Sequence, residues 1–106
     1  MRSLLVRFSL VSDAAAAEFD DLLSAALPGV EADEPGTLVY LVHRVADPLE
    51  RVVTAVYADA AAHETHNARP GMAALLARLP ELTSSVLVEE HSSVTGFAHL
   101  PAKELV

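Results

Sequence analysis

Cysteine and tryptophan are both absent from this chain of 106 residues. Without cysteine there can be no disulfide framework, no thiolate metal site and no cysteine nucleophile. The chain also lacks the ~18 continuous apolar residues that a membrane-spanning helix needs. Near the start, Arg7 interrupts the apolar run, which leaves a segment too short for the core of a signal peptide. We therefore expect a cytoplasmic protein that does not enter the membrane.

Basic residues are scarce. Seven lysines and arginines stand against 15 acidic residues, which gives a formal net charge of −8. An acidic surface repels the phosphates of nucleic acids and the headgroups of anionic lipids, so we expect neither nucleic acid nor a membrane as a partner. The length is that of one domain, and no linker or repeat divides it, so we expect a single domain over residues 1–106.

The hydrophobic periodicity predicts the order strand, helix, strand, strand, two helices, strand. We expect strands over residues 2–11, 37–45 and 51–57 and from Val86 toward Phe97, and helices over residues 13–27, 59–67 and 70–80. Pro28 and Gly29 are expected to weaken or end the first helix, and Pro80 to stop the last. This order is ferredoxin-like, and it predicts an α+β fold whose antiparallel sheet carries its helices on one face.

The predicted hairpin is apolar on both of its faces. Leu38, Tyr40 and Val42 point one way, while Val39 and Leu41 point the other. Right-handed crossovers place both helical segments on the same side, so the helices can cover only one face. At about 25 cal/mol per Å², leaving the second face wet would forfeit several kcal/mol. We therefore expect a homodimer in which a partner's sheet covers that face, with burial in a larger assembly as the alternative.

Three short pieces carry a family resemblance through their order and spacing. They are Glu34-Pro35-Gly36-Thr37-Leu38-x-Tyr40, Asp47-Pro48, and Val56-Tyr57-Ala58-Asp59-x-Ala61-Ala62-x-x-x-His66. Together they resemble the antibiotic biosynthesis monooxygenase family, which includes quinol monooxygenase-like proteins. The resemblance runs from the first strand to about Leu87. It implies a dimeric α+β barrel with a pocket in each subunit, between the helices and the inner face of the sheet.

The resemblance implies a cofactor-independent monooxygenase that oxidises a small phenolic, quinol or polyketide-like aromatic compound with dioxygen. The chain departs from the family pattern at Ala55, where many relatives carry a glutamate, and at Gly71 and Met72, where a histidine and a phenylalanine are frequent. It also lacks the tryptophan of the haem-degrading members. One alternative is therefore a non-catalytic dimer that binds small molecules in a retained pocket. A structural dimer with a collapsed pocket is the third interpretation.

His66 is the leading catalytic candidate, because imidazole exchanges protons near neutral pH and because this residue matches a persistent polar position of the family. The alternative is a histidine that fastens its helix to a neighbouring backbone carbonyl. His63 lies three residues before it, which does not fit the zinc-protease spacing of four, so we expect no metal site.

The resemblance also implies which side chains line the pocket. They are Phe8, Tyr40, Tyr57, Met72 and Leu75. For each of them, packing in the core is the alternative role.

Three cationic residues flank the predicted hairpin turn, namely His43, Arg44 and Arg51. Asp47 and Glu50 lie close to them in sequence. We expect these residues to form exposed ion pairs that add little to stability.

Overall fold

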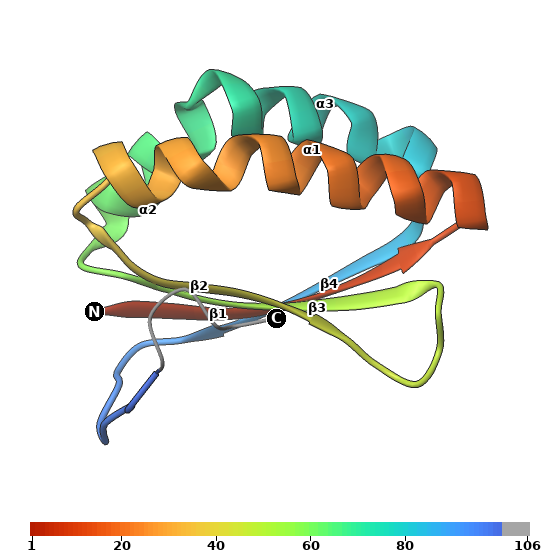
Figure 1. The fold of residues 1–106 in the computed structure, drawn as a ribbon. Coiled ribbons are helices and arrows are strands. Elements are labelled where there is room, and N and C mark those ends of the chain that lie inside the picture. The colour runs from red at the N-terminus through yellow and green to blue at the C-terminus, as the bar shows by residue number, and fades with distance from the viewer. Residues whose placement is uncertain (101–106) are drawn as a thin grey trace.

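The computed structural model describes residues 1–100, which form a four-stranded antiparallel sheet with three helices on one face (Figure 1). The strands are β1 (Arg2–Leu10), β2 (Thr37–Arg44), β3 (Glu50–Tyr57) and β4 (Thr83–His91), and the helices are α1 (Asp13–Asp33), α2 (Ala60–Ala68) and α3 (Pro70–Leu82). The strand order is β2-β3-β1-β4. This architecture confirms the predicted ferredoxin-like α+β fold. Within residues 1–100, no helix is long and apolar enough to cross a bilayer.

Side-chain oxygens cap the starts of α1 and α2. The Ser12 hydroxyl accepts a hydrogen bond from the amide of Ala15 at 3.1 Å, and the Asp59 carboxylate accepts one from the amide of Ala62 at 2.8 Å. Each cap satisfies an amide that the first helical turn leaves without a partner. Pro70 opens α3, where its missing N–H costs nothing.

The predicted helix ends were wrong. α1 continues through Pro28 to Asp33, and α3 continues through Pro80 to Leu82. A proline inside a helix removes one hydrogen bond. Beyond Pro28, however, Val30 is buried in the core, and beyond Pro80 Leu82 is buried as well. Burial of these side chains offsets the lost hydrogen bonds.

The last strand also differs from the prediction at both ends. β4 begins at Thr83, directly after α3, and ends at His91 instead of continuing toward Phe97. Its partner is β1, and His91 lies opposite Ser3, near the start of that strand. Beyond His91 only Arg2 of β1 remains as a residue to pair with, and residues 92–100 leave the sheet (Figure 1).

The core lies between the helices and the sheet face that they cover, here called the inner face. Phe19 of α1 is fully buried, and its ring centroid lies 4.9 Å from that of Phe8. From β3, Val53, Ala55 and Tyr57 are buried on the inner face, as the alternation predicted.

The opposite sheet face, here called the outer face, carries both apolar and charged side chains. By the alternation of the strands, it carries Leu5, Val39, Leu41, Val52, Val56 and Leu87. Arg7 lies between Val52 and Leu87 on this face and forms an ion pair with Glu50, while Glu89 lies opposite Leu5. Leu87 is 62% exposed, and Leu5 is also exposed. The part of the outer face formed by β2 and β3 is therefore largely apolar, as the hairpin pattern predicted, whereas β1 and β4 add charged side chains to the rest of it.

A register shift in β2 corrects the predicted position of Leu38. Thr37 lies opposite Tyr57 and Val39 opposite Val56, so Leu38 is the extra residue of a bulge. The bulge leaves Leu38 exposed, and Leu38 lines a groove at the β2 edge together with Val39 and Leu100. It also gives Thr37, instead of Leu38, the inward position beside Tyr57.

Arg51 and Arg44 were wrongly predicted to form exposed ion pairs with Asp47 or Glu50. Arg51 belongs to the inner face, is only 4% exposed, and donates two hydrogen bonds to the Asp20 carboxylate of α1 at 2.9 and 3.0 Å. Arg44 also donates to Asp20, at 3.1 Å. The strand alternation directs both arginines toward α1, whereas His43 remains exposed.

Candidate functional site

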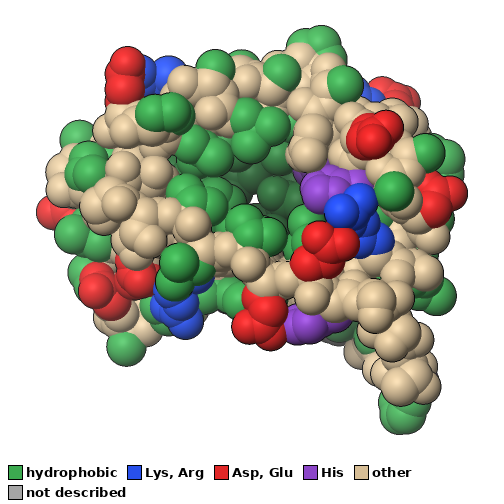
Figure 2. All heavy atoms as spheres, turned by 180° about the vertical axis from the view of Figure 1, so that it is seen from behind, with side chains coloured by type: hydrophobic (Ala, Val, Ile, Leu, Met, Phe, Trp, Pro, Cys, Tyr) green, Lys and Arg blue, Asp and Glu red, His purple; other side chains and the backbone are tan. Residues whose placement is uncertain are grey.

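A cavity of about 280 Å³ lies between the inner face of the sheet and helices α2 and α3. Figure 2 shows it from behind as a hollow lined by hydrophobic side chains. The side chains expected to line a pocket all contribute to its walls, namely Phe8, Tyr40, Tyr57, Met72 and Leu75. The cavity is thus open between the two layers of the fold, and the side chains of the core do not fill it.

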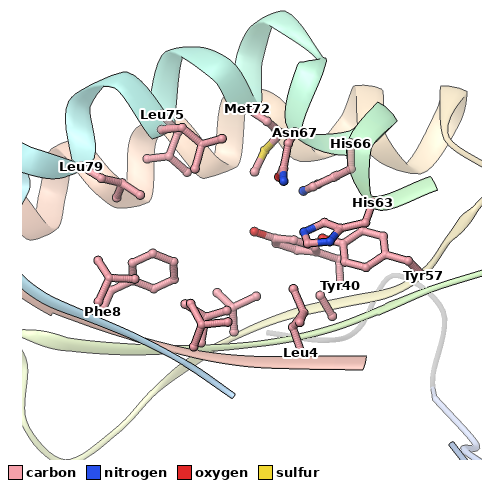
Figure 3. Close-up of a pocket in the computed structure, with 16 residues that line it drawn as sticks. Leu4, Phe8, Tyr40, Tyr57, His63, His66, Asn67, Met72, Leu75 and Leu79 are labelled. Atoms are coloured by element: carbon pink, nitrogen blue, oxygen red, sulfur yellow. The ribbon is translucent and has the colours of Figure 1, made fainter. Parts of the chain in front are cut away.

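Polar side chains gather at one end of this cavity (Figure 3). His63, His66 and Asn67 come from α2, where spacings of three and four residues place them on one helix face. Tyr40 and Tyr57 come from the sheet below, with ring centroids 5.1 and 5.3 Å from that of His66. The remaining wall is apolar. The cavity is therefore suited to a compact molecule with one polar edge.

His66 is buried, with 1% of its surface exposed, and its Nδ1 lies 2.9 Å from Oε1 of Glu34. The partner of the imidazole is thus a carboxylate, and not the backbone carbonyl that the sequence-based alternative expected. The other ring nitrogen, Nε2, has no hydrogen-bond partner within residues 1–100. Figure 3 shows the imidazole pointing from α2 into the cavity.

Glu34 was missed in the sequence because Glu34-Pro35-Gly36 suggests a turn. It caps the C-terminal end of α1, where the helix dipole disfavours a negative charge. An acidic residue at that position is a sequence signal for a specific cationic partner. That partner is Arg69, whose Nε donates to Oε2 of Glu34 at 2.6 Å.

The surroundings of Glu34 keep it ionised. Burial by itself would raise the pKa of this carboxyl group, but hydrogen bonds from His66, Arg69 and Thr37 outweigh burial and lower the pKa below its ordinary value. Thr37 donates to Oε1 at 2.9 Å, from the inward position that the β2 bulge gives it. Arg69 is itself held by the carbonyl oxygen of Gly29 at 2.8 Å.

The lowered pKa of Glu34 predicts how stability depends on pH. In the unfolded chain the group returns to its ordinary pKa of 4.5, so acid favours unfolding. The contribution of Glu34 is complete above that value and is lost as the pH falls through the lower folded pKa. In urea titrations from about pH 5 to about pH 3, we expect the free energy of unfolding to fall more steeply for the wild type than for Glu34→Gln. Equal slopes for the two proteins would contradict this prediction.

The two tyrosines remain protonated near neutral pH. Burial, with a further contribution from the charge of Glu34, raises the pKa of Tyr40 to about 12. Burial also raises the pKa of Tyr57, as do the nearby Tyr40 and Glu34. Within residues 1–100 neither hydroxyl has a hydrogen-bond partner, and neither is sealed off from the cavity. Both phenols are thus free to donate a hydrogen bond to a ligand.

His63 stacks on Tyr57 with ring centroids 4.5 Å apart. Burial, followed by the charge of the nearby Arg2, lowers the pKa of His63, so it is a neutral imidazole near pH 7. Within residues 1–100, no three histidine, aspartate or glutamate side chains come together in a way that could hold a metal ion.

The departures from the family pattern have different structural positions. Ala55 is buried on the cavity floor, so the floor carries no carboxylate there. Gly71 does not line the cavity. A Cβ atom added to it would lie 3.1 Å from the Cβ of Ala26, so this position faces α1 and favours close helix packing. Met72 lines the cavity instead.

Comparison with solved structures supports the same fold. A protein from Mycobacterium tuberculosis superposes with a TM-score of 0.79 at 22% identity, over 92% of this chain and 98% of that chain. A proposed antibiotic biosynthesis monooxygenase from Caulobacter crescentus gives 0.77 at 24% identity, over 89% and 90%. A protein of unknown function from Nitrosomonas europaea gives 0.72 at 29% identity, over 95% and 94%.

Comparison of the sequence identifies the family. No curated protein matches the chain. Residues 1–78 match the sequence profile described as antibiotic biosynthesis monooxygenase. This match includes β1, α1, β2, β3, α2 and most of α3, and with them both tyrosines, His66 and Glu34. On that match, the chain belongs to the antibiotic biosynthesis monooxygenase family.

Proposed function

We propose that this protein is a cofactor-independent monooxygenase that oxidises a small phenolic or quinol-like compound with dioxygen. The observation that carries the proposal is the polar end of the cavity, where an unpartnered Nε2 and two neutral phenols meet an otherwise apolar chamber. A proton acceptor beside hydrogen-bond donors is the arrangement needed to ionise a hydroxyl group and to stabilise the oxyanion that results.

In the proposed reaction, Nε2 of His66 takes the hydroxyl proton of the substrate. Tyr40 and Tyr57 donate hydrogen bonds that stabilise the resulting oxyanion. The negative charge of this oxyanion raises the electron density of the ring that reacts with dioxygen. For a phenol with hydrogen at the para position, the products are a quinone and water. One oxygen atom enters each product, the ring loses two electron pairs in all, and no external reductant is needed. The apolar walls exclude water from the reactive anion.

The cavity volume limits the substrate. At about 30 Å³ per water molecule, 280 Å³ holds roughly nine water-sized groups. A compound of one or two aromatic rings is of this size, whereas a tetracyclic polyketide or a haem is much larger. We therefore propose a one- or two-ring substrate whose hydroxyl lies beside α2.

A non-catalytic dimer that binds the same compounds is the second candidate. It is favoured by Ala55, which leaves the cavity floor without a carboxylate. Both candidates share the homodimer that we propose to form through the outer face. That face carries leucine and valine side chains from all four strands, with the Arg7–Glu50 ion pair among them.

Oxygen uptake tests the proposed reaction. With a panel of naphthols and one-ring quinols, we expect the wild type to consume oxygen and His66→Ala to be at least about 100-fold slower, because a positioned base contributes that much or more. His43→Ala is the matched control, since His43 is exposed and does not line the cavity. It should retain the wild-type rate.

The outcomes separate the two candidates. Tight binding of a naphthol in calorimetry without any oxygen uptake would favour the binding protein. An unchanged rate in His66→Ala would exclude this histidine as the base.

A further inference from the structure

Both carboxylate oxygens of Glu34 have hydrogen-bond partners among the neighbouring side chains. Oε1 lies 2.9 Å from Nδ1 of His66 and 2.9 Å from the Thr37 hydroxyl, and Oε2 lies 2.6 Å from Nε of Arg69. Arg69 can only donate hydrogen bonds. It also donates to the carbonyl oxygen of Gly29 and to Asp33, which fixes its position at the junction of α2 and α3.

These contacts determine which nitrogen of His66 carries the proton. An ionised carboxylate can only accept, so Nδ1 must be the donor at 2.9 Å. A neutral imidazole has a single N–H group, and Nε2 is then left with its lone pair. Nε2 has no partner within residues 1–100, and His66 lines the cavity. The lone pair of Nε2, which can accept a proton, is therefore offered to the cavity.

We propose that Glu34 is a positioning residue that holds His66 in the Nδ1–H tautomer and thereby selects ligands that carry a free hydroxyl group. The role of Glu34 in turnover rests on the function proposed above, whereas the tautomer of His66 does not depend on that function. The ligand must donate to Nε2 and accept from the hydroxyls of Tyr40 and Tyr57. A phenol satisfies both requirements. Its methyl ether keeps the acceptor but has no proton for Nε2.

A purely structural role for Glu34 makes a different prediction. The carboxylate joins the end of α1 to α2 and to the start of α3, so its loss would lower stability in either case. Only the positioning role requires the tautomer of His66 to follow the chemistry at residue 34. Glu34→Gln separates the two, because glutamine has nearly the same shape but replaces one acceptor with an NH₂ donor.

The expected effect of Glu34→Gln is a reversed tautomer. Because Arg69 can only donate, the amide oxygen of the glutamine should face Arg69 and its NH₂ group should face Nδ1 of His66. Nδ1 then becomes the acceptor, and the proton moves to Nε2. The ring now offers a donor to the cavity, and a ligand hydroxyl loses its acceptor.

Nitrogen-15 NMR of histidine-labelled protein above pH 7 measures the tautomer directly, with the His66 signal assigned by its absence in His66→Ala. We expect the proton on Nδ1 in the wild type and on Nε2 in Glu34→Gln. Glu18→Gln is the matched control, because it changes another carboxylate of α1, one that pairs with Arg78 away from the cavity. It should leave the His66 signals unchanged. A wild-type proton on Nε2 overturns the proposal even if Glu34→Gln fails to fold.

Binding under nitrogen tests the ligand class, with 1-naphthol and its methyl ether as probes. We expect the wild type to bind the naphthol at least about tenfold more tightly, because the ether leaves the buried Nε2 without a partner. Glu34→Gln should lose this preference. Equal affinities in the wild type would overturn the proposed selectivity. If the tautomer and the preference are as expected but no oxygen is consumed, the oxygenase fails and this inference stands. If oxygen is consumed but Glu34→Gln leaves the tautomer of His66 unchanged, the proposed oxygenase stands and the positioning role of Glu34 fails.

Discussion

Replacement of Asp20 by alanine is expected to lower the free energy of unfolding by about 3 kcal/mol, measured by urea denaturation. The Asp20 carboxylate accepts two hydrogen bonds from Arg51, whose side chain is only 5% exposed. In the variant the guanidinium keeps the carbonyl oxygens of Pro48 and Glu50 but loses the carboxylate that neutralises it. A buried charge without its partner is costly, because neither water nor an opposite charge solvates it.

Two variants test this explanation. Glu18→Ala breaks another ion pair from the same helix, but Glu18 and Arg78 are each 41% exposed, so the loss of stability should be much smaller than for Asp20→Ala. Asp20→Ala combined with Arg51→Met should recover part of the stability, because methionine removes the unpaired charge and keeps the apolar stem. Equal losses for Asp20→Ala and Glu18→Ala would show that burial of the pair is not the cause.

Strand alternation was the part of the fold that the sequence predicted best. Val53, Ala55 and Tyr57 are buried together because a period of two follows directly from the geometry of a strand. Helix ends were less predictable. Pro28 is a strong local signal, but the burial of Val30 depends on contacts that local sequence does not contain.

The candidate site, like the fold, could be predicted only in part from the sequence. His66 and the residues that line the cavity could be proposed from a motif and from alternation. Glu34 could not, because 32 residues separate it from His66 and its role depends on the position of Arg69. Thr37 donates to Glu34 from the inward position that the bulge at Leu38 gives it, and the alternating pattern of β2 does not reveal that bulge. Pairs formed through tertiary structure, such as Arg51 with Asp20, were missed for the same reason.

The proposed homodimer follows from the outer face, where leucine and valine side chains of all four strands lie opposite the helices. Leu41 of β2 shares this face with Leu5 and with the exposed Leu87. A carboxylate placed among them would lose its water when the two sheets meet, and Arg7, the arginine of this face, already pairs with Glu50. Because the assembly is symmetric, each interface would contain two such charges.

We therefore expect Leu41→Asp to weaken dimerisation at least about 100-fold, because burial of an unpaired charge costs several kcal/mol. In sedimentation equilibrium at micromolar concentration, the wild type should have a mass of 22.4 kDa, twice the 11.2 kDa of one chain, and the variant should approach 11.2 kDa. Leu76→Asp is the control, because it makes the same exchange at an exposed position of α3, on the helical side. A monomeric wild type, or equal dissociation of the two variants, would mean that the outer face does not bind a second copy.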